Sequence, residues 1–206
     1  MRLLYGTGNP AKLQYMQKAI KGLGIELYGL DYFGKAVPDV VEDGATPLEN
    51  ARLKAQAYYQ VFQVPVFSCD TGLYFEQIPD GLQPGVHVRN VGGRYLRDDE
   101  MIAYYGSLAR QYYPLKGQYR NAVCLILDEH TTIESMDEAL GGTVFQLTEQ
   151  PHHKIIPGFP IDSLALEIES GQYYYDLAED TDEDESEQAA FREFFRKNIP
   201  LKACTE

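Results

Sequence analysis

The sequence contains no tryptophan and only three cysteines among its 206 residues. Such a sparse, odd set argues against a disulfide framework and fits a reducing compartment, and the cysteine spacing matches no zinc site. No apolar run approaches the roughly 20 residues of a membrane span, and the apolar start is too short for a signal peptide. We therefore expect a cytoplasmic protein without a membrane partner.

Positive charge is also scarce, since 18 Lys and Arg face 31 Asp and Glu and the net charge is −13. More than half of that charge comes from residues 176–187, which hold eight acids and no Lys or Arg. No basic face is visible, which argues against a nucleic-acid polymer as partner. We interpret the acidic run as a solvated insert, a loop or a helix face, within one domain that spans residues 1–206.

Hydrophobic periodicity and turn residues predict the secondary structure. Helices are expected from Pro10, from Thr46 to about Phe62, after Asp98 or Asp99 as the N-cap, and around Phe191 near the C-terminus. The expected strands are 2–6, 25–30, 66–69, 119–127, 131–136, 142–147 and 164–169. Strands first alternate with helices and then follow one another, which predicts an α/β fold: a long mixed sheet with flanking helices, in two lobes around a central cleft.

The segment Thr7 to Lys12 joins the first strand to the first helix. A helix N-terminus with free backbone N–H groups binds anions, and Lys12 in its first turn can reach a phosphate. Thr7 and Asn9 add side-chain donors. The alternative is an ordinary turn followed by a solvated lysine.

Carboxylates gather around the start of the next helix. Glu42 precedes Gly44, Glu49 stands three residues after the N-cap Thr46, and Lys54 follows on the helix. Magnesium prefers carboxylate oxygens combined with substrate phosphates. Capping and surface charge explain Glu49 equally well, but they leave Glu42 unexplained.

Asp70 follows the apolar strand that begins at Val66 and precedes Gly72, so we expect it at the end of that strand. Strand ends are where α/β proteins place groups that face a ligand. There Asp70 can hold a metal or take a proton from water. An Asx turn that merely ends the strand is the alternative.

The predicted loop from Gly158 to Asp162 puts an aromatic ring beside a carboxylate. Phe159 can stack on a base and Asp162 can bind a base edge or ribose, although a core Phe with a turn Asp is the alternative. The adjacent His152 and His153 have no partners at metal-binding spacing, so we expect a solvated loop there.

Taken together, these motifs resemble the inosine/xanthosine triphosphate pyrophosphatase family, which is also called Ham1-like. The motifs of this family appear here in the same order. Its Thr-x-Asn-x-x-Lys appears as Thr7 to Lys12, and its Glu-x-Gly with Glu-Asn-Ala-x-x-Lys-Ala appears as Glu42 to Ala55. Its Asp-Asp-Ser-Gly-Leu appears as Cys69 to Leu73, its Pro-Gly as Pro84-Gly85 and its Gly-Phe-Gly-Tyr-Asp as Gly158 to Asp162.

The resemblance implies hydrolysis of a nucleoside triphosphate such as ITP, dITP or XTP to a monophosphate and pyrophosphate. It implies Mg²⁺ as cofactor, held by Glu42 and Asp70, and a homodimer. The implied catalytic residues are Asp70, Lys12 and Glu42. The implied substrate-binding residues are Thr7, Asn9, Lys12, Lys54, Thr71, Gly72, Phe159 and Asp162.

Three departures from the family pattern stand out. Cys69 replaces the first carboxylate of the aspartate pair, and a thiol is a poor ligand for magnesium. Val88-Arg89-Asn90-Val91 replaces the Ser-Ala-Arg-Tyr of many members, which shifts the arginine by one position. The family's C-terminal lysine and Ser-His-Arg, which hold the purine's 6-keto group, are absent. We therefore predict an altered or broadened base preference, with His153 or Lys154 as possible substitutes.

Two other classes of function stay open. One is a catalytically weak or inactive nucleotide-binding protein of the same fold, which Cys69 and the missing base-binding residues suggest. The other is an interaction protein that presents the acidic run to a basic partner.

Overall fold

Two compact units, each with its own core, make up the chain. The computed structural model describes residues 1–34, 36–177 and 182–200. The first unit comprises Met1–Thr71, Asn121–Gly141 and Asp182–Glu206, and the second comprises Gly72–Arg120 and Gly142–Thr181. Two long strands, β3 (Val66–Phe75) and β6 (Leu115–Asp128), each contribute residues to both units.

In the described residues, seven strands form a mixed sheet in the order β2-β1-β3-β6-β8-β9, with β7 paired to β6. The expected α/β class with a mixed sheet and flanking helices is confirmed. The other strands of this sheet are β1 (Arg2–Tyr5), β2 (Glu26–Tyr28), β7 (Thr131–Ser135), β8 (Phe145–Leu147) and β9 (Ala165–Leu166).

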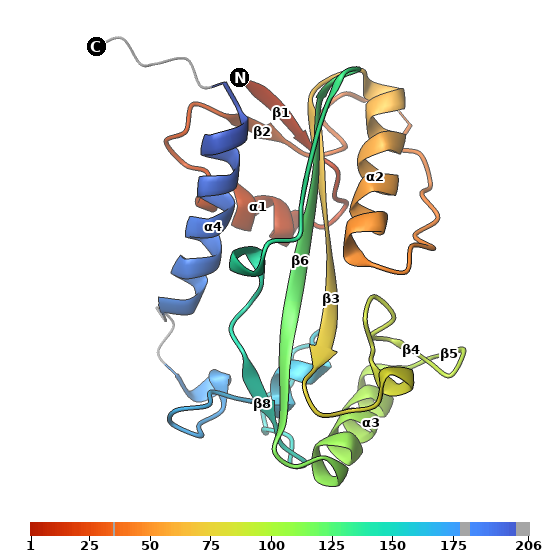
Figure 1. Ribbon diagram of the computed structural model, residues 1–206, viewed down its shortest axis with the longest axis vertical. Coiled ribbons are helices and arrows are strands. Elements are labelled where there is room, and N and C mark those ends of the chain that lie inside the picture. Colours follow the sequence, from red (N-terminus) through yellow and green to blue (C-terminus); the bar gives the residue numbers. More distant parts are fainter. Residues whose placement is uncertain (35, 178–181, 201–206) are drawn as a thin grey trace. The chain divides into compact units, whose positions relative to one another are not determined.

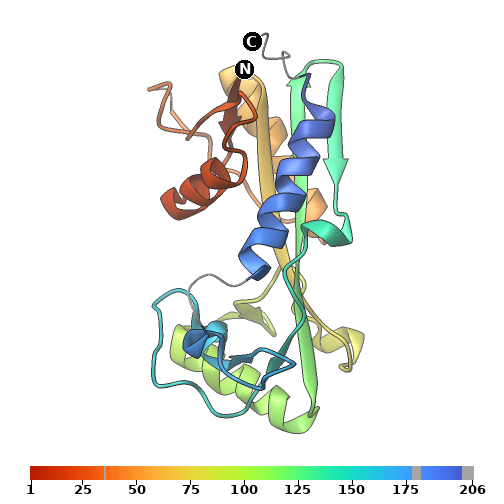
Figure 2. The same cartoon turned by 90° about the vertical axis from the view of Figure 1, so that its left-hand side faces the viewer.

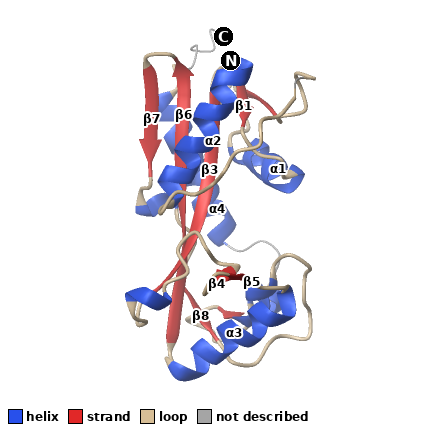
Figure 3. Cartoon of the chain, turned by 90° about the vertical axis from the view of Figure 1, so that its right-hand side faces the viewer, coloured by secondary structure: helices blue, strands red, loops and turns tan. Residues whose placement is uncertain are grey.

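In the first unit, β1 pairs in parallel with both β2 and β3, and β6 and β7 form an antiparallel hairpin (Figure 3). Successive residues of β1 point to opposite faces, as in any strand. Leu3 packs in one core with α1 (Pro10–Ala19) and α4 (Asp182–Asn198), whereas Leu4 packs in another with α2 (Pro47–Phe62). The helices accordingly cover both faces: α1 and α4 lie to the left of the strands in Figure 1 and α2 to the right. Figure 2 shows α4 running along these strands.

Local sequence explains where α1 and α2 begin. The side-chain oxygen of Asn9 accepts hydrogen bonds from the backbone N–H groups of Ala11 and Lys12, and proline follows as the first helical residue. Thr46 caps α2 in the same way, because its hydroxyl oxygen accepts from Glu49 N at 3.2 Å. Both helix starts thus combine a side-chain cap with a proline, which has no backbone N–H that would need a partner.

In the second unit, α3 (Asp98–Gln111) packs its buried residues, among them Met101 and Tyr105, against apolar side chains of β3, β6 and β8. A short hairpin, β4 (Asn90–Val91) with β5 (Arg94–Tyr95), precedes it. The remaining elements are short 3-10 helices at Asp80–Leu82, Pro160–Leu164 and Tyr174–Asp176 in this unit and at Glu138–Leu140 in the first unit.

The strand that carries Asp70 was predicted wrongly. It does not end at Asp70 but continues to Phe75, so Asp70 and Gly72 are mid-strand residues and no turn separates them. The apolar residues Leu73 and Phe75 explain the continuation, because both are buried in the core of the second unit.

Other sequence-based expectations need smaller corrections. The N-cap of α3 is Arg97 rather than Asp98 or Asp99. Asp162 lies inside the 3-10 helix that begins at Pro160, not in an open loop. Of the acidic run, residues 178–181 lie outside the described part of the chain, and α4 begins at Asp182. Among the described helices, none combines the length and apolar character needed to cross a membrane.

The N-cap of α2 can be tested by replacing Thr46. Thr46→Ala should lower the free energy of unfolding by about 1 kcal/mol, because Glu49 N loses its acceptor. Thr46→Ser retains the hydroxyl and should stay within about 0.5 kcal/mol of the wild type. Urea unfolding followed by circular dichroism measures both, and equal losses in the two variants would contradict the cap.

Candidate functional site

One pocket of about 300 Å³ in the first unit collects most of the residues that the sequence singled out there. They come from the turn after β1 with the first turn of α1, the chain leading into α2, α2 itself, and the middle of β3. The lining residues are Gly6, Thr7, Gly8, Asn9, Lys12, Glu42, Lys54, Tyr58, Cys69 and Asp70.

The turn after β1 brings the N-terminus of α1 to this pocket. Gly6 is required here, because a Cβ would overlap with the Ser68 hydroxyl and the Tyr58 ring. Lys12 is exposed and forms no ion pair with any residue that the structure describes. Its ammonium group and the helix N-terminus thus present positive charge to an anion.

Lys54 stands between two carboxylates. Its Nζ lies 2.8 Å from Glu42 Oε2 and 2.8 Å from Asp70 Oδ1, and only 11% of its side chain is exposed. Burial by itself lowers the pKa of Lys54, but the neighbouring Asp70 and Glu42 carboxylates outweigh this effect and raise that pKa. The ammonium group therefore stays charged and draws the two carboxylates together.

The side-chain amide of Asn50 joins the segment that carries Glu42 to the strand that carries Asp70. Its Nδ2 donates to Asp70 Oδ2 at 3.1 Å, and its Oδ1 accepts from Gly44 N at 2.8 Å. A Cβ on Gly44 would lie 2.7 Å from Asn50 Oδ1, so glycine permits the close approach. Sequence reasoning did not select Asn50 as a site residue. Its position one turn before Lys54 on α2 was the available signal.

Cys69 lines the pocket as a neutral thiol. Burial is the main cause that raises the pKa of Cys69 to about 12, despite a hydrogen bond with Tyr5 and the nearby Lys12 and Lys54. At neutral pH this thiol therefore keeps its proton.

Thr71 is not among the residues that line the pocket. Its hydroxyl lies 2.7 Å from Asn121 Oδ1, and Asn121 Nδ2 in turn donates to Leu140 O. Thr71 thus links β3 to β6 and the following 3-10 helix. The remaining predicted residues, Gly72, Phe159 and Asp162, belong to the second unit.

In the second unit, Arg89 fixes the segment that carries Phe159. Arg89 Nη1 lies 2.8 Å from Asp98 Oδ1, and Arg89 Nη2 donates to Gly158 O at 3.0 Å. Gly158 N donates to Asp98 Oδ2 at 2.8 Å, and Gly158 has a φ of +88° that favours glycine. Phe159 next to it is 54% exposed and thus available for stacking. The arginine that is shifted in sequence thus orders this segment.

The loop with His152 was predicted to be solvated, and this is wrong for His152 itself. His152 is buried, and its Nε2 lies 3.2 Å from Asp176 Oδ1. Its Nδ1 accepts from Lys154 N at 3.0 Å, which leaves the proton on Nε2. The partner lies 24 residues away in the sequence, so local composition did not reveal it.

The residues of the first-unit pocket fit a magnesium ion shared with a ligand. In the described part of the chain, no group of three His, Cys, Asp or Glu side chains is placed to hold a metal alone. Glu42 and Asp70 supply two carboxylates that already converge on one cation, the Lys54 ammonium. Magnesium is commonly held by one or two carboxylates, with phosphate oxygens and water completing its shell.

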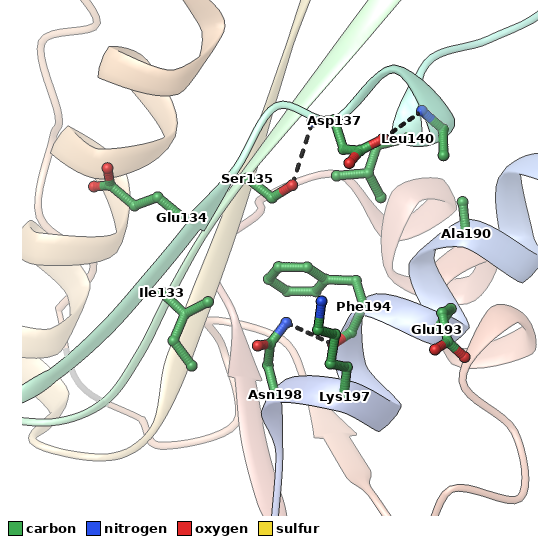
Figure 4. Close-up of a pocket in the computed structure, with 11 residues that line it drawn as sticks. Ile133, Glu134, Ser135, Asp137, Leu140, Ala190, Glu193, Phe194, Lys197 and Asn198 are labelled. Atoms are coloured by element: carbon green, nitrogen blue, oxygen red, sulfur yellow. Dashed lines mark hydrogen bonds between the residues drawn. The ribbon is translucent and has the colours of Figure 1, made fainter.

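A second cavity in the first unit, of about 340 Å³, lies between β7, the 3-10 helix after it and α4 (Figure 4). Its walls are largely apolar, with Ile133, Leu140 and Phe194. Asp137 accepts a hydrogen bond from Ala139 N, and Glu193 is paired with Arg196. None of the predicted site residues lines this cavity.

Comparison with known proteins gives a consistent result. The model of the Ham1 family matches residues 3–155. A dITP/XTP pyrophosphatase of Thermus thermophilus is 32% identical over 183 residues, which cover 86% of this chain and 81% of that protein. A HAM1 protein from Coxiella burnetii shares the fold with a TM-score of 0.73 and 21% identity over 94% of this chain and 96% of its own. The Staphylococcus aureus Ham1 protein has the same TM-score at 16% identity, over 96% and 99% of the two chains.

The burial of Asp162 predicts a pH-dependent stability. Desolvation raises its pKa from 3.8 to about 6 in the folded protein. Between these values the folded state binds the proton that the unfolded chain has lost, so the free energy of unfolding falls as the pH rises. Above pH ~6, Asp162→Asn should therefore be more stable than the wild type by up to about 3 kcal/mol.

Urea unfolding at about pH 4 and about pH 7 measures this difference. The advantage of Asp162→Asn should be small at the lower pH and full at the higher one. An identical difference at both pH values would show that the carboxyl group does not titrate as its burial implies.

Proposed function

The chain belongs to the Ham1 family, and we propose that it is a magnesium-dependent pyrophosphatase of non-standard purine nucleoside triphosphates such as dITP and XTP. Curated relatives named dITP/XTP pyrophosphatase support this class of enzyme. The observation that carries the proposal is that the carboxylates of Glu42 and Asp70 both contact the ammonium group of Lys54, in the pocket that the start of α1 also lines.

The triphosphate binds through positive charge in the first-unit pocket. Lys12, Lys54 and the N–H groups at the start of α1 neutralise its phosphate oxygens, and Thr7 and Asn9 orient the chain of phosphates. Magnesium, when held by Glu42 and Asp70 together with phosphate oxygens, supplies further neutralising charge. Positioning and charge stabilisation of this kind dominate catalysis of phosphoryl transfer.

The reaction is attack of water on the α-phosphorus. A bond forms between the water oxygen and the α-phosphorus, and the bond from that phosphorus to the bridging oxygen of the leaving pyrophosphate breaks. Asp70 accepts the proton that water loses, because it is the more buried carboxylate of the pair and is fixed by Asn50. The products are a nucleoside monophosphate and pyrophosphate.

For recognition of the base we propose Phe159 and Asp162, and residues 1–206 remain a single domain in this proposal. Phe159 stacks on the base, and Asp162, whose pKa burial raises to about 6, accepts hydrogen bonds from the base or the ribose as a carboxylate at neutral pH. Since the family's C-terminal lysine and Ser-His-Arg are missing, we propose that the base preference is altered or broadened. The homodimer likewise remains a prediction from the resemblance.

A second candidate is a nucleotide-binding protein without turnover. The neutral Cys69 thiol favours it, because this residue replaces a carboxylate of the family and weakens the metal site. Triphosphate binding without release of pyrophosphate from any nucleotide would support this candidate instead.

Removal of either pocket carboxylate should abolish most of the activity. We expect Glu42→Gln and Asp70→Asn each to lower kcat by at least ~100-fold, which is typical for loss of a group that stabilises charge in the transition state. Asp43→Asn is the matched control, because it makes the same change of charge at an exposed neighbour that does not line the pocket.

Release of pyrophosphate and monophosphate is measured with ITP, dITP, XTP, ATP and GTP in the presence of magnesium. The wild type and Asp43→Asn should cleave at least one of them at similar rates. No release from any nucleotide, or equal losses in the control and the two pocket variants, would contradict the proposed function.

A further inference from the structure

Lys54 occupies the position between the two carboxylates that the proposed function assigns to a metal ion. Its Nζ contacts Glu42 Oε2 and Asp70 Oδ1 at the same distance of 2.8 Å. We propose that Lys54 is a positioning residue that keeps divalent cations out of the free protein and leaves the carboxylates only when a triphosphate binds. This inference rests on the proposed function, because it takes Glu42 and Asp70 as the metal ligands.

Charge and space both require the ammonium group to leave. A metal ion bound to the same two oxygens would lie close to Nζ, since Mg²⁺–oxygen distances are only about 2.1 Å. Two cations that close repel each other strongly, the more so in a site where the lysine and aspartate side chains are 11% and 15% exposed. The ammonium group and a metal ion therefore exclude each other.

A bound triphosphate gives Lys54 another partner. Lys54 shares the pocket with Lys12 and with the turn before α1, where the phosphates are proposed to bind. The ammonium group sits on a flexible four-carbon stem and can exchange one set of oxygens for another without movement of α2. As the phosphates arrive, Lys54 turns to them, and the carboxylate oxygens become available to the cation that the nucleotide brings.

Asn50 keeps the Asp70 carboxylate in place during this exchange and ties it to the backbone near Glu42. Its amide joins Asp70 Oδ2 to the backbone of Gly44, two residues after Glu42, and it does so without Lys54. Asp70 Oδ2 is a different oxygen from the one that Lys54 contacts. The two segments that carry the metal ligands thus stay joined when the shared counter-ion leaves.

The consequence is a coupling between the two ligands. Free protein should bind a divalent cation weakly, and a triphosphate should increase that affinity. By linkage, the cation should increase the affinity for the triphosphate by the same factor.

The test is Mn²⁺ binding, followed by electron paramagnetic resonance or calorimetry on the full chain without turnover. Lys54→Met should bind Mn²⁺ at least ~10-fold more tightly than the wild type in the absence of nucleotide, because it removes the competing charge. Lys12→Met removes a charge from the same pocket but none of the carboxylate contacts, and it should change the affinity much less. Addition of Asp70→Asn to Lys54→Met should abolish the gain, which assigns it to this site.

An α,β-methylene analogue of ITP, which is not cleaved, completes the experiment. With the analogue, the wild type should reach the Mn²⁺ affinity of Lys54→Met, after correction for Mn²⁺ bound by the analogue alone. If Lys54→Met does not fold, as circular dichroism would show, Lys54→Gln carries the same test with another neutral side chain.

Equal Mn²⁺ affinity of the wild type and the neutral variants would overturn the inference. That result leaves the proposed function intact if pyrophosphate is still released and Asp70→Asn still abolishes the release. Conversely, a gain of Mn²⁺ affinity in a protein without pyrophosphatase activity would support the exclusion by Lys54 while refuting the proposed function.

Discussion

The site depends on the ionic contact of Lys54 with Glu42 and Asp70. Two carboxylates from segments 28 residues apart would repel each other without a cation between them, and here the ammonium group of a third residue supplies it. The amide of Asn50 adds hydrogen bonds to the same two segments. Lys54 and Asp70 are largely buried, so removal of either one leaves an uncompensated charge on the other, whereas Glu42 is 44% exposed.

The fold brings these groups together through ordinary local rules. The caps Asn9 and Thr46 fix the starts of α1 and α2, and both helix starts lie near the pocket residues. Gly6 and Gly44 allow backbone and side chains to approach where a Cβ would not fit. The helices bury their apolar faces on opposite sides of the strands, whereas Lys54 on α2 and Asp70 in the middle of β3 line the pocket.

Local signals were predictable from the sequence, and non-local ones were not. Both caps follow from side chains a few positions apart, whereas the grouping of Glu42 with Asp70 was implied by the resemblance to the family. The continuation of β3 beyond Asp70 depends on the cores of two separate units, and the Asp-Thr-Gly order suggested a turn instead. The burial of His152 depends on Asp176, which lies 24 residues away, and Lys54 pairs with Glu42 and Asp70 at separations of 12 and 16 residues. In each case the missing information was a contact distant in sequence.

The most direct test of the account is a crystal structure of the chain with magnesium and the α,β-methylene analogue of ITP. The account predicts one metal ion bound to both Glu42 and Asp70 at about 2.1 Å, with phosphate oxygens in its shell and Lys54 turned onto the phosphates. A metal ion bound elsewhere, or an ammonium group still lying between the two carboxylates beside a bound triphosphate, would contradict it.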